Sequence, residues 1–408
     1  MLSETSAATI RATLPAVGGA IGEITKCFYG RLFDAHPDLL RDLFNRGNQA
    51  NGEQQQALAG SIAAFASALV AHPDVRPDAM LERIAHKHAS LGVTRDQYAI
   101  VHRHLFAAIV EVLGEAVTDE VAAAWDEVYW LMANVLIAIE ARLYDAAGAA
   151  PGATLRPYAV VARHRETDDV TTFVVRPADG TPTPAFRAGQ YVSVQVELAD
   201  GARQIRQYSL SGAPGQDLQF TVKRVAATAD GDPAGEVSQH LHDHAHEGTE
   251  LLVSAPFGDV QLDDGDGPLL LASAGIGCTP MIGMLAHLAA AGSPRRVTAV
   301  HADVDQSSHA FRTELDRLVA KLPRAESHVW YETPEGDWPA HRTGRVDLAD
   351  RTDEAQPSGI ELAPDTTAYL CGPLPFLRAV RSQLIERGLA PAAIRYEVFG
   401  PDLWQAER

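Results

Sequence analysis

The spacing of apolar residues changes twice along this 408-residue chain, and each change constrains the fold. In residues 1–146 apolar side chains recur at i, i+3 and i+4, the spacing of amphipathic helices. From residue 158 to about residue 262 they alternate with polar ones between glycine and proline turns, as in half-buried strands. From residue 269 strand patterns alternate with helix patterns, which indicates a parallel sheet. The sequence therefore predicts a multidomain protein: all-α, then β, then α/β.

The predicted boundaries follow these changes. Residues 1–146 form the helical domain, 147–154 a linker of small and helix-breaking residues, 155–264 the β domain and 265–408 the α/β domain. The predicted helices of the first domain are 21–33, 57–70, 98–112 and 121–144. In the last domain, strands 269–271, 297–301 and 368–370 alternate with helices 279–291, 310–322 and 376–387.

Charge and composition exclude several kinds of partner. With 53 acidic and 34 basic residues, the net charge of −19 opposes binding to nucleic acid or to an anionic membrane. No apolar run reaches the length of a membrane span, and the N-terminus lacks an export signal. Cys27, Cys278 and Cys371 are too far apart for a zinc motif and form no disulfide framework. A reducing cytoplasm is the expected location.

The β domain contains the motif Arg206-Gln207-Tyr208-Ser209, which follows an alternating strand that begins at Gln190-Tyr191. A guanidinium can pair with a pyrophosphate oxygen, a tyrosine ring can pack on an isoalloxazine, and a serine hydroxyl can hydrogen-bond near flavin N5. The motif thus favours a flavin dinucleotide. The alternative is an ordinary amphipathic strand with an exposed arginine.

Two glycine turns follow strands of the α/β domain. The first contains Gly275 and Gly277 and leads into a helix that starts near Thr279-Pro280, and the second is Cys371-Gly372-Pro373. Glycine permits tight turns and close backbone approach, and a helix N-terminus offers free N–H groups to a pyrophosphate. Ligands of open α/β sheets bind at the carboxyl ends of strands, so both turns are candidate nucleotide contacts. Glu397 and Phe399 near the C-terminus could lie over a flavin, or belong to a last edge strand.

These motifs, together with Gly235-Glu236-Val237-Ser238, occur in an order that resembles the ferredoxin-NADP reductase superfamily. The helical segment in front makes the whole chain similar to the flavohaemoglobins. That resemblance implies a globin domain, an antiparallel β-barrel that binds FAD and an α/β domain that binds NAD(P)H. Its cofactor-binding residues in the reductase part would be Tyr191, Arg206, Gln207, Tyr208, Ser209, Gly235, Val237, Ser238, Gly275, Gly277, Thr279, Pro280, Cys371, Gly372, Pro373, Glu397 and Phe399.

A haem pocket needs one imidazole on the iron, apolar walls and a polar group opposite. The sequence offers His86 and His88, which a helix turns to nearly opposite faces, and periodicity favours neither. The resemblance implies that His88 is the proximal ligand and that His86 is solvated.

The resemblance also assigns the two walls of the pocket. Phe44 and Leu58 belong to the distal wall, with Tyr29 and Gln54 as the polar groups near bound O2. Tyr98 and Glu140 lie on the proximal side, the carboxylate directed toward the imidazole. From the residues alone, Glu140 would be a solvent-exposed helix acid.

The function implied by the resemblance is nitric oxide dioxygenase. NAD(P)H reduces FAD, FAD reduces haem b, and haem-bound O2 oxidises nitric oxide to nitrate, with Tyr29, Gln54, Tyr98 and Glu140 as catalytic residues. An alternative is a flavin and haem reductase acting on lipid hydroperoxides or other acceptors, and another is a globin sensor or oxygen carrier. Because the second strand is followed by His301-Ala302-Asp303, without a basic cluster for a 2′-phosphate, NADH is favoured over NADPH. The family precedent is a monomer.

Two features stand apart from the resemblance. The run His240-Leu-His242-Asp-His244-Ala-His246 has i, i+4 histidine pairs that can hold a metal, but the family implies none there. Cys278 stands where relatives more often have glutamine, and Val398 where cysteine is common.

Overall fold

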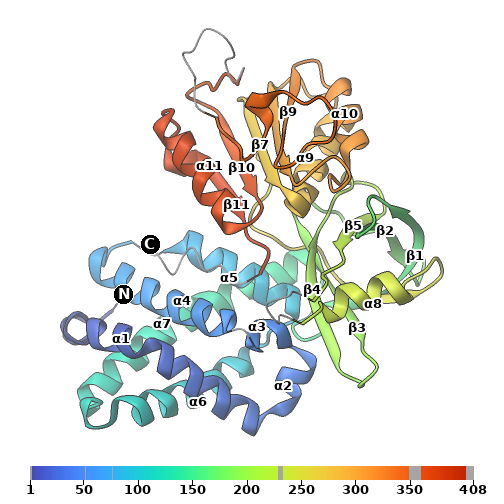
Figure 1. Ribbon diagram of the computed structural model, residues 1–408. Helices are drawn as coiled ribbons and strands as arrows, with labels where there is room; N and C mark the ends of the chain where they lie inside the picture. Colours follow the sequence, from blue (N-terminus) through green and yellow to red (C-terminus); the bar gives the residue numbers. More distant parts are fainter. Residues whose placement is uncertain (1, 51, 76, 228–232, 349–359, 401–408) are drawn as a thin grey trace.

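The structure, a computed structural model, describes residues 2–50, 52–75, 77–227, 233–348 and 360–400. It has three parts: a helical domain, a β-barrel and an α/β domain (Figure 1). The helices of the first are α1 (Glu4–Ala35), α2 (Pro37–Asp42), α3 (Arg46–Ala50), α4 (Glu53–Ala71), α5 (Asp78–Leu91), α6 (Arg95–Leu113) and α7 (Asp119–Ala147), with a 3-10 turn at Gly114–Ala116.

Local signals explain where the long helices begin and end. Thr94 and Gln97 form a capping box at the start of α6, and Thr118 caps α7 ahead of two acidic residues that favour a helix N-terminus. Helix α5 ends at Gly92, which adopts the left-handed conformation at φ 76°. The four predicted helices lie within α1, α4, α6 and α7, and their apolar faces form one core. Helices α2 and α3 were not predicted, and α5 was expected only as the helix that carries His86 and His88.

Helix α7 is the one described helix that is long and apolar enough to cross a membrane by length and composition. No such segment was predicted from the sequence. Its buried residues, among them Trp125, Val128 and Leu136, pack in the core of the helical domain.

The barrel consists of one antiparallel sheet in the order β4-β3-β6-β1-β2-β5. Its strands are β1 (Leu155–Arg165), β2 (Val170–Pro177), β3 (Tyr191–Glu197), β4 (Arg203–Ser209), β5 (Leu218–Lys223) and β6 (Glu250–Ser254), and α8 (Glu236–His244) precedes β6. A bridge between Leu210 and Phe220 joins the end of β4 to β5 and closes the sheet. Because the sheet is closed, the alternate residues of a strand that point into the barrel, such as Val192 and Val194 of β3, are fully buried.

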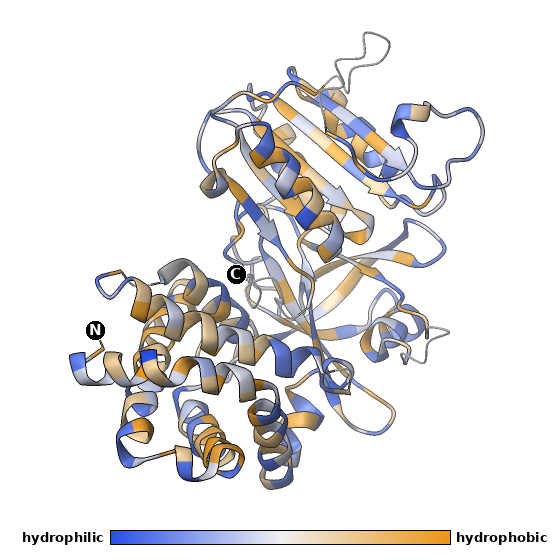
Figure 2. Cartoon of the chain, turned by 60° about the vertical axis from the view of Figure 1, so that its left-hand side comes forward, coloured by the Kyte–Doolittle hydropathy of each residue, from blue (hydrophilic) through white to orange (hydrophobic). Residues whose placement is uncertain are grey.

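The α/β domain has a five-stranded parallel sheet in the order β11-β10-β7-β8-β9. Its elements are β7 (Leu269–Ala274), a 3-10 turn (Gly275–Gly277), α9 (Cys278–Ala290), β8 (Val297–Asp303), α10 (Arg312–Lys321), β9 (Ala325–Tyr331), a 3-10 turn (Ala340–Arg342), β10 (Thr367–Cys371), α11 (Leu374–Glu386), a 3-10 turn (Pro391–Ala393) and β11 (Ile394–Glu397). Apolar strands lie between helices (Figure 2). Strand β9 was not predicted.

The order of strands in this sheet fixes a binding edge. From β7 the chain runs outward to β8 and β9, then returns to place β10 on the other side of β7. The strand order therefore reverses between β7 and β10, and ligands of such sheets bind at the carboxyl ends of the strands beside this point. The two glycine turns follow these strands, so both lie at this binding edge.

Candidate functional site

The proximal residues of the helical domain form one hydrogen-bonded group. His88 Nδ1 lies 2.8 Å from Glu140 Oε1 and 2.9 Å from the Tyr98 hydroxyl, and that hydroxyl donates to Glu140 at 2.5 Å. Helices α5, α6 and α7 supply one residue each. A carboxylate accepts and cannot donate, so the imidazole proton resides on Nδ1 and Nε2 keeps its lone pair.

The hydrogen bonds of this group are shielded from water, because its members Glu140 and Tyr98 are buried. Glu140 is 3% exposed, so it is not the surface acid that the residues alone would suggest. Burial, and then the neighbouring Glu140 charge, raises the pKa of Tyr98 well above its ordinary value, so the phenol stays protonated and acts as a donor. The buried carboxylate thus has two donors, and it orients the imidazole.

The distal residues meet around the hydroxyl of Tyr29. The Tyr29 ring packs edge-on against Phe44 with centroids 5.9 Å apart, and Leu58 packs against the same core. Burial raises the pKa of Tyr29, and the nearby Gln54 and Gln49 amides lower it in part. The Gln49 Nε2 is buried and has no hydrogen-bond partner among the described residues. Gln54 was predicted in this place. Gln49, on the unpredicted helix α3, was missed.

These residues fit a haem. An iron ligand needs a neutral imidazole with a free nitrogen, and Nδ1 of His88 is occupied by Glu140 while Nε2 makes no hydrogen bond to any described residue. A distal wall needs apolar groups and one donor for a polar diatomic ligand. Phe44, Leu58 and the protonated Tyr29 hydroxyl meet that need.

His86 is not solvated, and that expectation was wrong. The side chain is buried, with the whole residue 6% exposed, and Nδ1 accepts a 2.9 Å hydrogen bond from the backbone N–H of Gly258. The two histidines do lie on different faces of α5, but the face that carries His86 is covered by the barrel. Helical periodicity indicates that a helix face does not pack in the core of its own domain. It cannot indicate that a second domain covers that face.

The flavin motif lies on strand β4, beside the helical domain. Arg206 donates to Ile205 O at 2.7 Å, Gln204 Oε1 at 3.2 Å and Asn45 Oδ1 at 2.8 Å. All these acceptors are neutral, and burial lowers the pKa of the guanidinium. A half-buried cation whose hydrogen-bond partners are neutral favours an anion, so Arg206 fits a pyrophosphate. It is not the exposed strand arginine of the alternative reading.

The other residues of the motif alternate across the strand. Tyr208 stacks on Phe220 with centroids 5.5 Å apart, and Ser209 is buried opposite Tyr191. Gln207 donates to Ser90 Oγ at 3.2 Å, and Ser90 lies two residues beyond His88 on α5. The strand expected to hold the flavin is therefore joined directly to the helix that carries His88, the residue expected to bind the haem iron.

The Gly235 to Ser238 turn starts helix α8 next to strands β3, β4 and β5. Ser238 Oγ donates to Gly235 O at 2.9 Å and accepts from Val225 N at 3.1 Å. A Cβ atom at position 235 would stand 2.7 Å from Ser238 Oγ, so glycine is required. Val237 is buried in the barrel core, which leaves its backbone N–H as the group that could bind phosphate.

At the carboxyl ends of β7 and β10, the two glycine turns touch each other. A Cβ atom on Gly277 would lie 2.4 Å from Cys371 O, so no other residue fits there. Thr279 Oγ1 donates to Ile276 O at 3.1 Å, and Pro280 lies in the first turn of α9. The other predicted residues, Gly275, Gly372 and Pro373, lie in the same two turns.

Glu397 ends strand β11, the edge strand that the alternative reading expected. Burial raises the pKa of Glu397 to about 7, although the positive charges of Arg83 and Lys87 lower it in part. Its Oε2 is buried and has no hydrogen-bond partner among the described residues. Phe399, two residues on, is 47% exposed. A buried acid with an unused oxygen suits a donor on a bound flavin or nicotinamide.

The histidine run of α8 divides into separate contacts. His242 is buried and its Nε2–H donates to Val222 O at 2.9 Å, while His246 accepts from Arg163. The rings of His240 and His244 meet with centroids 4.9 Å apart. Among the described residues no group of three or more histidine, cysteine or acidic side chains is placed to hold a metal ion.

A helical domain with a buried His88–Tyr98–Glu140 group, a barrel with a half-buried arginine on its flavin motif and a parallel sheet with two glycine turns at its binding edge define a class: an oxidoreductase that joins a haem domain to a flavin reductase. Family models agree, with Globin matching residues 26–136, the oxidoreductase FAD-binding domain 157–262 and the oxidoreductase NAD-binding domain 271–382. The chain belongs to the flavohemoprotein family. Its cofactors are haem, FAD and a nicotinamide nucleotide.

Relatives match along the whole length. The flavohemoproteins of Bordetella parapertussis and Chromobacterium violaceum are 44% and 43% identical, covering 98% of this chain and 99% and 98% of theirs. The crystal structure of flavohemoglobin from Malassezia yamatoensis with bound FAD and heme superposes with a TM-score of 0.86 at 36% identity, over 98% of this chain and 100% of that one. The FAD/NAD-binding domain of nitric oxide dioxygenase from Vibrio cholerae is 35% identical with a TM-score of 0.53, over 60% of this chain and 99% of that one.

Proposed function

We propose that this flavohemoprotein is a nitric oxide dioxygenase that uses NAD(P)H and O2 to convert nitric oxide to nitrate. The observation that carries the proposal is the buried group of His88, Tyr98 and Glu140. A carboxylate hydrogen-bonded to an iron-binding imidazole raises its basicity and favours O2 activation over reversible storage. An oxygen carrier or sensor would not need the attached reductase.

When bound, haem supplies an O2 site, FAD accepts a hydride and passes on single electrons, and the nicotinamide donates the hydride. The chain's own residues position these groups. His88 presents Nε2 to the iron, held in that tautomer by Glu140, and the Tyr98 hydroxyl shares the carboxylate. On the other side the Tyr29 hydroxyl donates toward the ligand, and the amides of Gln54 and Gln49 orient it.

In the reductase part, Arg206 and the N-terminus of α8 hold the FAD phosphates, and Tyr208 and Ser209 lie along the flavin. The turns at Gly275–Gly277 and Cys371–Pro373 take the nicotinamide nucleotide. NADH is the preferred donor, because Asp303 ends β8 and its carboxylate would repel a 2′-phosphate. The protein acts as a cytoplasmic monomer without stable membrane association.

The test is an anaerobic absorption spectrum of the purified protein before and after NADH, followed by nitric oxide in air. We expect the flavin bands to bleach, the haem bands to shift to the ferrous form, and nitrate to accumulate. A flavin that bleaches while the haem stays ferric would overturn the proposal. Faster NADH consumption with a lipid hydroperoxide than with nitric oxide would favour the peroxide reductase instead. Arg206→Ala should lose the NADH-dependent reduction of both cofactors.

A further inference from the structure

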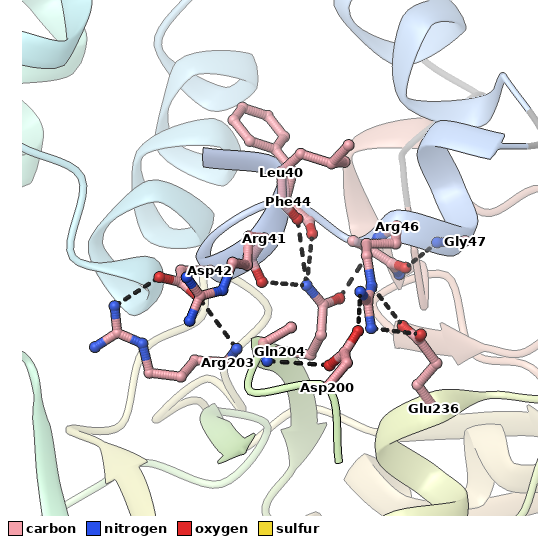
Figure 3. Close-up of polar contacts among 12 residues, drawn as sticks. Leu40, Arg41, Asp42, Phe44, Arg46, Gly47, Asp200, Arg203, Gln204 and Glu236 are labelled. Atoms are coloured by element: carbon pink, nitrogen blue, oxygen red, sulfur yellow. Dashed lines mark hydrogen bonds and ion pairs between the residues drawn. The ribbon is translucent and has the colours of Figure 1, made fainter. Parts of the chain in front are cut away.

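The short helices α2 and α3 and their connection, residues 37–50, lie between the distal wall of the haem pocket and the barrel; we call them the distal segment (Figure 1). On the globin side Phe44 packs against Tyr29, and the Gln49 amide, whose Nε2 is buried with no hydrogen-bond partner among the described residues, lies near enough to the Tyr29 hydroxyl to lower its pKa in part. On the barrel side a network of polar contacts joins the segment to β4 and α8 (Figure 3). The segment therefore touches both cofactor sites.

The side chain of Gln204 on β4 contacts the distal segment at the C-terminal end of helix α2, where the hydrogen bonds within that helix end. Helix α2 has six residues, too few to be stable alone, and its last carbonyls need partners. The Gln204 side-chain amide donates to Arg41 O at 2.9 Å, Phe44 O at 3.3 Å and Leu40 O at 3.4 Å. Gln204 is fully buried. A side chain of the flavin domain thus fixes the backbone that carries Phe44.

Asn45 connects the start of α3 to the flavin motif. Its Oδ1 accepts from Gly47 N at 3.0 Å and Asn48 N at 3.3 Å, which caps the helix that carries Gln49. The same oxygen accepts from Arg206 Nη2 at 2.8 Å. The guanidinium assigned to the FAD pyrophosphate is therefore also a partner of the helix cap.

Arg46 makes a second link between the same two regions. Its guanidinium binds Glu236 at 2.7 and 3.2 Å and Asp200 at 2.7 Å. Glu236 is the first residue of α8, whose N-terminus is the other element assigned to the FAD phosphates. Both phosphate-binding elements of the barrel thus contact the distal segment.

We propose that Asn45 and Gln204 are positioning residues that couple FAD binding to ligand binding on the distal side of the haem. The inference rests on the proposed roles of Arg206 and Tyr29, and not on nitric oxide as the substrate. FAD bound at Arg206 orders β4, and through Gln204 and Asn45 it orders Phe44 and Gln49 against Tyr29. A distal ligand then meets a wall that is already ordered and binds more tightly. Linkage requires that the ligand tighten FAD by the same factor.

The experiment uses the full-length haem-loaded chain, with FAD removed and then restored, and azide as the ligand of the ferric haem. Azide Kd is read from the haem absorption, and FAD Kd from flavin fluorescence with and without azide. For the wild type we expect FAD to tighten azide about fivefold or more, and azide to tighten FAD equally. Gln204→Leu and Asn45→Ala should reduce both factors to less than about twofold.

Two further variants distinguish a loss of coupling from a general disturbance of the distal segment. Arg41→Ala is the matched control, because it removes an exposed hydrogen bond from the same segment to Gly201 O and should keep the wild-type factor. Asn45→Asp retains the cap and the Arg206 contact, so it should keep more coupling than Asn45→Ala. If Gln204→Leu fails to take up haem, the comparison of these two Asn45 variants tests the proposal instead. Equal azide affinity with and without FAD in the wild type, or full coupling in Asn45→Ala, would overturn the proposal. Nitrate yield plays no part, so the proposed activity can fail independently.

Discussion

The backbone N–H of Gly258, in the barrel, donates a 2.9 Å hydrogen bond to Nδ1 of His86, on helix α5 of the globin domain. Two residues further along that helix, His88 Nδ1 lies 2.8 Å from Glu140 inside the globin domain. A single helix therefore presents one histidine to the reductase and the other, the proposed iron ligand, to the globin domain. Arg83 of the same helix adds contacts to Asp259 and to the carbonyl of Tyr396, so α5 touches both reductase domains.

His86→Leu should destabilise the holoprotein, because it leaves the Gly258 N–H buried without an acceptor, a loss of about 1–3 kcal/mol. Thermal unfolding of the haem- and FAD-loaded protein measures the effect. His86→Gln offers an acceptor and should recover part of it. Glu82→Gln, which weakens a 4.0 Å contact to His86 and a 3.7 Å ion pair with the exposed Arg142 but leaves the Gly258 hydrogen bond intact, is the control. Unchanged melting in His86→Leu would show that this contact contributes no stability.

Glu140→Gln should raise the reduction potential of the haem and lower nitric oxide turnover about 10–100-fold. The negative carboxylate beside His88 Nδ1 stabilises the ferric iron, and the neutral amide does not. Spectroelectrochemistry gives the potential. Tyr98→Phe keeps the carboxylate, so its potential should move less. The assignment fails if Glu140→Gln has the wild-type potential.

Tyr29→Phe should speed O2 dissociation from the ferrous protein about tenfold, since one donor to the ligand is lost. Stopped-flow displacement of O2 by carbon monoxide measures this rate. Tyr144→Phe is a suitable control, because it removes another buried tyrosine hydroxyl, which donates to Val93 O at 2.7 Å. An unchanged rate in Tyr29→Phe would mean that the hydroxyl does not reach the ligand.

Glu397 should make the folded state less stable as pH rises. Burial raises its pKa to about 7 from an ordinary value of 4.5, so between these values the folded protein holds a proton that the unfolded chain has lost. Stability should therefore fall from about pH 4.5 to about pH 7, by at most about 3 kcal/mol, and then stay level. Glu397→Gln removes this component. Melting curves at pH 5 and pH 8 should thus diverge less for the variant than for the wild type; equal divergence would contradict the assignment.

Asp303→Asn should raise the ratio of kcat/KM for NADPH to that for NADH about tenfold, because it removes a negative charge that repels the 2′-phosphate. Asparagine can keep the hydrogen bond from Val304 N, 2.8 Å in length, so the turn should be preserved. Steady-state reduction of an artificial acceptor measures both donors. Asp305→Asn, on the exposed turn that follows, should leave the ratio unchanged.

The features that could be predicted from the sequence are those whose signal lies within a single helix, strand or turn. Apolar spacing predicted four globin helices, and glycine with a strand pattern predicted the turn at Gly275–Gly277. Strand β9 was missed because it is an edge strand whose polar residues Glu326 and His328 break the alternation. The contacts between domains left no local signal: Gln204 and Asn45 are polar residues in a strand and a loop, and only the fold shows that one is buried and the other binds Arg206.

Ala89, Tyr144, Tyr191 and Phe257 form an apolar cluster shared by the globin and the barrel. A packed apolar cluster, together with the polar contacts of the distal segment, holds the globin and the barrel in one orientation. In the proposed function, electron transfer from flavin to haem would then be a first-order event across a constant gap, independent of protein concentration. No docking encounter precedes it, so a single molecule has everything that the transfer requires.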